Sequence, residues 1–208
     1  MAAAGAGAHA VFGPCNAIYD DDTPAWMRRG DYHSNRIHWR RPINTGYTSN
    51  VLLDLRFARR HQLRFDPALG RTGGEDTMFF HAMHRAGASL AYAPDAVVHE
   101  DVARPRMSLN WIARRRYRAG QVYAMMFDRY DRTRYRRLSF AAPLKIATCA
   151  IMSLATAAFP SRAMAWVVRG AFHSGMLSYA LGASLYQEYS ANAHIRQYSG
   201  RSLDRNRP

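Results

Sequence analysis

The residues best suited to catalysis form one short run, in which two glycines are followed directly by two carboxylates, Gly73-Gly74-Glu75-Asp76. Glycine allows a backbone to approach a ligand closely, and a carboxylate can take the proton from a hydroxyl group held against it. A helical pattern follows, so the helix dipole would keep both carboxylates ionised and lower their basicity. An acidic first turn is also an ordinary way to begin a helix, and this interpretation needs no chemistry.

The element that would position these carboxylates is a helix over residues 75–86. Phe79, Met83 and Ala86 recur at the i, i+4, i+7 spacing of one buried helical face. Gly87 is then well placed to end the helix. The pattern therefore predicts an amphipathic helix whose first turn carries both carboxylates.

The sequence around this helix predicts short strands and one further helix. Residues 10–14 are typical of a strand that ends at a Gly-Pro breaker, and residues 90–93 and 96–98 are typical of two more strands. A helix is expected over residues 51–61, capped by Asn50 or by the serine before it. Together these elements predict an α/β domain.

A long loop is predicted over residues 15–48, and loops of this length are often functional. Its aromatic side chains could stack on sugar rings or could pack beneath the loop. They are Trp26, Tyr32, Trp39 and Tyr47. An acidic triplet at residues 20–22 contains the Asp-x-Asp pattern. Because runs of charge are usually exposed, we interpret the triplet as a solvated loop and not as a metal site.

The composition indicates a folded protein with an anionic partner. Of the 208 residues, 48% are hydrophobic and 21% are charged, which excludes a disordered chain. Lys and Arg total 29 against 15 Asp and Glu, a net charge of +14 that suits nucleic acid, phospholipid headgroups or a nucleotide-sugar phosphate. The two cysteines form no Cys-x-x-Cys pair, which excludes a zinc cage of cysteines. The first ten residues do not resemble a signal peptide.

The composition changes after Pro105, so we divide the chain into residues 1–105 and 106–208. A helix over residues 107–137 carries nine arginines. Two apolar stretches follow. Residues 146–159 are fewer than the roughly 20 that a membrane span needs. Residues 163–186 are numerous enough but contain Arg169 and His173, and such side chains are costly inside a bilayer.

This basic and apolar tail suits an anionic membrane surface, and a plain solvated helix face is the alternative. We expect peripheral or integral association with the cytoplasmic face of the bacterial inner membrane. After Gln187 the chain is polar, and we expect it to fray.

Four pieces of the chain together resemble family 2 glycosyltransferases of the GT-A fold, and especially bacterial exopolysaccharide enzymes of the succinoglycan type. In the family's order they are Phe12-Gly13-Pro14, Thr45-Gly46-Tyr47-Thr48-Ser49-Asn50-Val51-Leu52-Leu53, Gly73-Gly74-Glu75-Asp76-Thr77 with Phe79-Phe80, and Ala93-Pro94-Asp95-Ala96-Val97-Val98-His99-Glu100-Asp101. The resemblance covers roughly residues 10–120. It implies an α/β fold that forms the later part of a GT-A domain, followed by a helical tail.

The resemblance also implies roles. Asp76 would be the general base that deprotonates the acceptor hydroxyl, with Glu75 orienting the acceptor or the base. His99 would help to hold a divalent metal, Mg²⁺ or Mn²⁺, on the donor diphosphate. The reaction would be an inverting displacement at the anomeric carbon, in which the metal neutralises the leaving nucleotide. The substrate-binding residues predicted are Gly46, Asn50, Gly73, Gly74 and Trp26.

The chain departs from the family pattern in two ways. Ser49 stands where the family often has glycine. In the family, a nucleotide-binding half with an Asp-x-Asp metal motif precedes the Phe-Gly-Pro strand, and nothing before Ala10 supplies it. We therefore expect the chain to be the later portion of the enzyme.

The predicted function is transfer of a sugar from a nucleotide-sugar donor to a glycan or lipid-linked acceptor in cell-surface polysaccharide synthesis. The first alternative is an inactive fragment or paralogue that binds only acceptor or membrane. The second is a basic nucleic-acid-binding protein. We expect no nucleic-acid partner, because no nucleic-acid fold signature accompanies the arginines.

Overall fold

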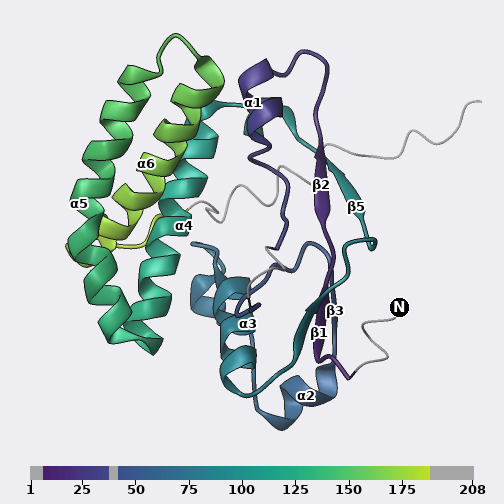
Figure 1. Ribbon diagram of the computed structural model, residues 1–208. Helices are drawn as coiled ribbons and strands as arrows, with labels where there is room; N and C mark the ends of the chain where they lie inside the picture. Colours follow the sequence, from purple (N-terminus) through teal and green to yellow (C-terminus); the bar gives the residue numbers. More distant parts are fainter. Residues whose placement is uncertain (1–6, 38–41, 188–208) are drawn as a thin grey trace, which may run out of the picture.

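The computed structural model describes residues 7–37 and 42–187, which form a mixed α/β body beside a bundle of three long helices (Figure 1). The strands are β1 (Ala10–Phe12), β2 (Cys15–Ile18), β3 (Val51–Leu53), β4 (Leu90–Tyr92) and β5 (Val98–Asp101). The helices are α1 (Ala25–Gly30), α2 (Leu55–Arg60), α3 (Glu75–Arg85), α4 (Leu109–Tyr130), α5 (Arg132–Ala155) and α6 (Pro160–Ala180), with 3-10 turns at Pro67–Leu69 and Arg104–Arg106. Trp39 and the polar segment after Gln187 lie outside the described residues.

The strands form two small sheets. In the first sheet, β1 lies between β3, with which it is antiparallel, and β4, with which it is parallel. In the second sheet, β2 and β5 pair in parallel, with Cys15 opposite Val98 and Ile18 opposite Asp101. The strands predicted at 10–14 and 90–93 are confirmed as β1 and β4, whereas the strand predicted at 96–98 lies further along the chain as β5.

Two of the predictions from the sequence are wrong. Residues 15–48 are not one loop, because β2 pairs with β5 and the short helix α1 follows. The helix predicted over 51–61 is a strand, β3, followed by the helix α2. Asp54 caps that helix by accepting a hydrogen bond from the backbone N–H of Arg56 at 2.9 Å. Pairing with β1 decides the conformation of residues 51–53, and no local pattern reveals such pairing.

Helix α3 forms a layer between the first sheet and the bundle (Figure 1). Phe80 and Met83 are fully buried against the sheet, and the Phe80 ring meets that of Phe12 edge to face at 4.8 Å. Met78 turns the other way and packs with Met126 and Phe127 of α4. The helix predicted over 75–86 is thus confirmed.

Helices α4, α5 and α6 pack side by side, with α6 between the other two (Figure 1). The backbones of α4 and α6 touch where two glycines face the partner helix. A β-carbon on Gly120 would collide with the Phe172 carbonyl, and one on Gly175 would collide with the Tyr117 carbonyl. The predicted basic helix breaks at Asp131, which caps α5 by accepting from the backbone N–H of Arg134 at 3.0 Å.

Candidate functional site

A cavity of about 310 Å³ opens where α3 begins and where α4 passes the ends of β2 and β5. Its lining residues come from six separate segments of the chain. They are Cys15, Ala17, His33, Asn35, Tyr47, Thr48, Ser49, Gly73, Gly74, Glu75, Asp76, Glu100, Asp101, Val102, Arg106, Trp111, Arg115 and Arg118. Three of the four segments that carry the family resemblance contribute to this wall.

The glycine pair brings the start of α3 against α4. Gly73 has φ +70° and Gly74 has φ +93°, backbone conformations that residues with a β-carbon rarely adopt. A β-carbon would also collide with the Arg118 guanidinium at the first position and with the Val122 side chain at the second. These glycines therefore let the start of α3 pack closely against α4. This packing places Glu75 and Asp76 on the cavity wall.

Asp76 has the environment of a proton acceptor. Burial raises the pKa of its carboxyl group, and the neighbouring Glu75 raises that pKa further. The hydrogen bond from the Thr77 N–H, 2.6 Å from the carboxylate, and the positive charge of Arg118 act in the opposite direction but are outweighed. The expectation of lowered basicity at a helix N-terminus was therefore wrong for Asp76, because desolvation dominates over the groups that favour the charged form.

Residues of β5 also line the cavity. Glu100 and Asp101 line it, and Glu100 pairs with Arg106 at 3.3 Å. His99 lies between Val98 and Glu100 on this strand, is exposed, and does not line the cavity. The structure therefore does not bring His99 and Asp76 into one cavity, and the metal role of His99 stays a prediction.

Aromatic and basic side chains also line the cavity. The His33 ring stacks on Trp111 with ring centroids 5.2 Å apart. The guanidinium groups of Arg115 and Arg106 lie over the Trp111 ring at 5.3 Å and 5.8 Å. Burial lowers the pKa of His33, while its Nε2 lies 3.0 Å from the Arg106 carbonyl and its Nδ1 lies 3.1 Å from the Tyr19 hydroxyl. A neutral His33 that donates from Nε2 and accepts at Nδ1 satisfies both contacts.

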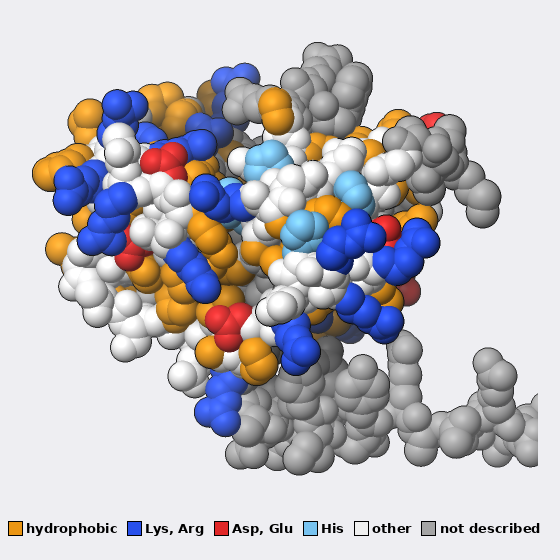
Figure 2. Space-filling view, turned by 90° about the horizontal axis from the view of Figure 1, so that it is seen from below, with side chains coloured by type: hydrophobic (Ala, Val, Ile, Leu, Met, Phe, Trp, Pro, Cys, Tyr) orange, Lys and Arg blue, Asp and Glu red, His pale blue; other side chains and the backbone are white. Residues whose placement is uncertain are grey.

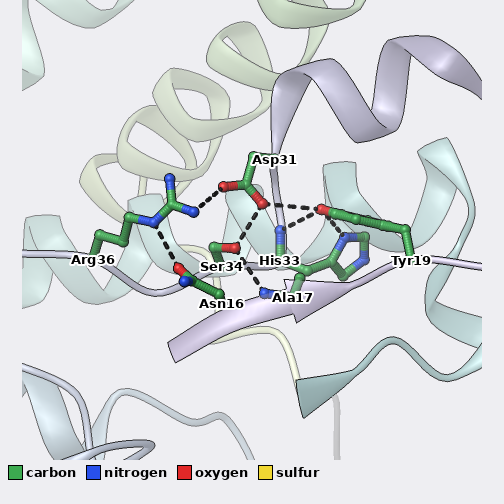
Figure 3. Close-up of polar contacts among 7 residues, drawn as sticks. All are labelled: Asn16, Ala17, Tyr19, Asp31, His33, Ser34 and Arg36. Carbon is green, nitrogen blue, oxygen red and sulfur yellow. Dashed lines mark hydrogen bonds and ion pairs between the residues drawn. The ribbon is translucent and has the colours of Figure 1, made fainter. Parts of the chain in front are cut away.

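Polar contacts hold the segment that carries His33 against β2 (Figure 3). Asp31 accepts a hydrogen bond from the Ser34 hydroxyl at 2.6 Å and pairs with Arg36 at 3.0 Å. The Ser34 oxygen in turn accepts from the Ala17 N–H at 2.9 Å. Arg36 donates to the side-chain oxygen of Asn16, also at 2.9 Å. This network fixes one wall of the cavity to the sheet.

Three other predicted site residues have packing or tethering contacts outside the cavity. The Asn50 amide donates to the carbonyls of Pro14 at 3.0 Å and Ala96 at 2.6 Å, which joins three chain segments. The backbone of Gly46 lies against the Phe12 ring, where a β-carbon would not fit. The ring of Trp26 packs near that of Tyr32, with centroids 5.9 Å apart. None of the three lines the cavity, and their substrate contacts stay predictions.

Sequence reasoning missed the wall of the cavity that comes from the second half of the chain. Arg115 and Arg118 were visible only as part of a basic run, and neither Arg106 nor Trp111 was singled out. One signal was available, because Trp111, Arg115 and Arg118 recur at i, i+4 and i+7 and so share one helical face.

Metal ligands do not converge in the part of the chain that is described. Among residues 7–37 and 42–187, no group of three or more His, Cys, Asp or Glu side chains could hold a metal ion. These described residues therefore do not form a complete metal site by themselves.

The α/β body and the long helices thus enclose a cavity lined by carboxylates and by aromatic and basic side chains. The chain is 40% identical over 189 residues to the succinoglycan biosynthesis protein ExoM of Rhizobium meliloti (strain 1021). That similarity covers 89% of this chain and 60% of the relative, so the chain spans about 60% of the length of the curated relative it matches. No family model matches the chain, and no solved structure matches it.

Proposed function

We propose that this chain is the acceptor-side portion of a family 2 glycosyltransferase of the GT-A fold that acts in exopolysaccharide synthesis. The whole protein would transfer a sugar from a nucleotide-sugar donor to a glycan or lipid-linked acceptor. The observation that carries the proposal is the position of Asp76, a carboxylate of raised pKa on the wall of a cavity. Similarity to a succinoglycan biosynthesis protein supports the biological process.

In the proposed reaction, the acceptor sugar lies in the cavity with one hydroxyl group against the Asp76 carboxylate. Asp76 takes the proton as the hydroxyl oxygen bonds to the anomeric carbon of the donor, and the bond from that carbon to the nucleotide diphosphate breaks with inversion. Burial is the main cause of the raised pKa of Asp76, and the negative charge of Glu75 adds to it. Tyr47 offers an aromatic surface for a sugar ring, and the carboxylates and guanidinium groups offer hydrogen-bond partners for its hydroxyls.

A divalent metal, Mg²⁺ or Mn²⁺, is part of the proposal because it would neutralise the departing diphosphate. His99 is the proposed contact of this chain with that metal. Substitution of His99 by alanine should weaken metal-dependent donor binding more than acceptor binding, as measured by titration with and without chelator. Unchanged metal dependence would remove His99 from the proposal.

The test of the transferase proposal compares two variants in a full-length protein that carries this chain. Asp76→Asn removes the base, and Asp21→Asn makes the same chemical change at an exposed loop position outside the cavity. Acceptor-dependent release of nucleoside diphosphate is measured with a panel of nucleotide sugars and a lipid extract as acceptor. We expect Asp76→Asn to lose about 10²–10⁴-fold in rate while donor binding persists, and Asp21→Asn to match the parent. A rate for Asp76→Asn within about threefold of the parent would contradict the role of Asp76.

A further inference from the structure

Helix α5 presents an apolar face that no part of the described chain covers. Phe140, Leu144, Ile151 and Leu154 have exposed fractions of 86%, 73%, 64% and 78%. With Ala147 they lie along one side of the helix, because 3.6 residues make one turn. We call these five residues the α5 stripe. Figure 1 shows α5 at the outer edge of the molecule, on the side of the bundle away from both sheets.

The charge around the stripe has a single sign. Residues 132–187 contain no Asp or Glu, and they contain six arginines and one lysine. Arg136 and Arg137 are exposed one turn before the stripe begins. Figure 2 views the molecule from below. On this lower side, basic side chains are scattered widely and acidic ones are few. An apolar strip beside an excess of positive charge is complementary to a bilayer with anionic headgroups.

The neighbourhood of the stripe also suits lipid. An apolar hollow of about 380 Å³ opens between α5 and α6 and is lined by Leu154, Trp166 and Val167 among others. Phe159, in the connection between the two helices, is 59% exposed, and Arg162 lies over its ring at 5.3 Å. An aromatic ring next to a cation is typical of the boundary between headgroups and acyl chains.

Within the described residues, α5 is the one helix whose length and composition would allow it to cross a membrane. Its packing favours a position along the surface instead. The stripe spans 15 residues, about 22 Å of helix, which is short of the roughly 30 Å hydrocarbon core. Along its inner side α5 packs on α6, where Cys149 lies against Gly170, and α6 packs closely on α4. Insertion across the bilayer would take α5 away from these partners or would bury the arginines of α4 and α6 in lipid.

We propose that the α5 stripe is the membrane-docking surface of this protein. Helix α5 lies parallel to the plane of an anionic bilayer, with the stripe at the boundary between headgroups and acyl chains and the flanking arginines on the phosphates. On the cytoplasmic face, this docking would hold the protein at the membrane that carries a lipid-linked acceptor. The docking surface itself does not depend on the proposed transferase activity.

The experiment is flotation of the 208-residue chain with vesicles of phosphatidylglycerol and phosphatidylcholine in equal parts, with phosphatidylcholine vesicles for comparison. The parent should float with the anionic vesicles at low salt and should be released by high salt or alkaline carbonate. The double variant Leu144→Glu/Leu154→Glu should bind about tenfold or more weakly, because it places two charges in the buried strip. Both leucines are highly exposed, so the variant should fold as the parent does.

A matched control makes the same chemical change elsewhere. Leu52→Glu/Leu55→Glu alters two leucines that are 63% and 55% exposed on β3 and α2, with an identical change in net charge. This control should keep most of the vesicle binding. Equal loss in both double variants would show that only net charge matters, and undiminished binding of the stripe variant would show that the stripe is not the contact. Either result would overturn the proposal.

Two further outcomes would replace the proposal with a different one. A parent that dimerises without lipid, and a stripe variant that is monomeric, would show that a second copy of the chain covers the stripe. Parent protein that stays with the vesicles through high salt and alkaline carbonate would show that α5 crosses the bilayer. None of these measurements depends on sugar transfer, so the membrane proposal can hold even if the transferase proposal fails.

Discussion

The buried Asp76 carboxylate should lower the stability of the fold when it is charged, and unfolding at different pH values can measure this effect. In the folded chain, burial holds the pKa of its carboxyl group above the ordinary value, whereas the unfolded chain titrates near 3.9. Below both pKa values the carboxyl group is neutral in either state. As the pH rises from the pKa of the unfolded chain to the raised pKa of the folded chain, the unfolded chain loses its proton first. The free energy of unfolding of the parent therefore falls over this range.

The isosteric variant Asp76→Asn has no proton to lose at this position. Its free energy of unfolding should therefore match that of the parent near pH 3 and exceed it near pH 7, with the difference appearing between about pH 3.9 and the raised pKa. Urea unfolding at a series of pH values measures the difference. The asparagine side chain can still accept the hydrogen bond from the Thr77 N–H, so the comparison isolates the charge. A variant that is less stable than the parent at neutral pH would show that Asp76 is stabilised, and not strained, by its surroundings.

Gly74 shows how one residue type sets the position of the carboxylates. Alanine at this position would have to adopt φ +93°, at a cost of about 1–2 kcal/mol, and its β-carbon would also collide with the side chain of Val122. Gly87 is a matched control, because it has φ +86° with no atom within 4 Å of an added β-carbon. We expect Gly74→Ala to lower the free energy of unfolding by more than Gly87→Ala does.

The loss of unfolding free energy for Gly74→Ala beyond that for Gly87→Ala measures the contact between α3 and α4. Adding Val122→Ala to Gly74→Ala should recover part of the excess, since it removes the atoms that collide. Equal costs at the two glycines would mean that α4 yields to the added methyl group.

At the scale of the elements, local patterns predicted α3 and failed for the second sheet. Helix α3 has a strong helical repeat and an evident stop at Gly87, so nearby residues decide it. Strand β2 pairs with β5 more than 80 residues away, and all four residues of β5 are exposed, so neither strand shows the alternation that reveals a half-buried strand. Only the part of the candidate site that lies in a local motif could be predicted, for the same reason. Glu75 and Asp76 lie in a local motif, whereas Trp111 and Arg115 reach the cavity only through the packing of α4.

At the contact between α4 and α6, helix propensity and packing predict opposite changes in stability when a glycine is replaced by alanine. In a helix interior, alanine is ordinarily more favourable than glycine by up to about 1 kcal/mol. At Gly175 the added β-carbon would collide with the backbone carbonyl of Tyr117, which cannot rotate away. We therefore expect Gly175→Ala to destabilise the protein by about 1–3 kcal/mol, the usual range for overpacking.

Gly170 on the same helix provides the comparison, because its β-carbon would meet only the side-chain carbon of Cys149 at 3.3 Å. Gly170→Ala should be close to neutral, and thermal melting of the two variants side by side measures the contrast. A stabilised Gly175→Ala variant would indicate that the backbones of α4 and α6 do not approach as closely as the structure has them.

At the scale of the whole molecule, the change in composition near Pro105 predicts a boundary between two parts, and two hydrophobic clusters join these parts. Met27 of α1 packs with Ile112 of α4 and Val168 of α6, so the first part of the chain contributes to the core of the bundle. Met78 of α3 contributes in the same way to the cluster around Met126. Both clusters contain residues of α4, which contributes to the wall of the cavity. The two halves should therefore unfold together, since each loses core contacts when the other opens.

Hydrogen exchange during urea unfolding can test this cooperativity, with amides of α3 reporting on the α/β body and amides of α6 reporting on the bundle. We expect the two sets to exchange with the same midpoint. Met78→Ala removes a side chain that is 5% exposed and should destabilise both halves equally, by about 2–5 kcal/mol, although the substitution lies in the first half. Met83→Ala is the internal comparison, because Met83 packs in the cluster beneath the first sheet and contacts no bundle residue there. If Met78→Ala lowered the midpoint of α3 and left that of α6 unchanged, the chain would consist of two independent units, and the wall that α4 contributes to the cavity would be free to move away from Asp76.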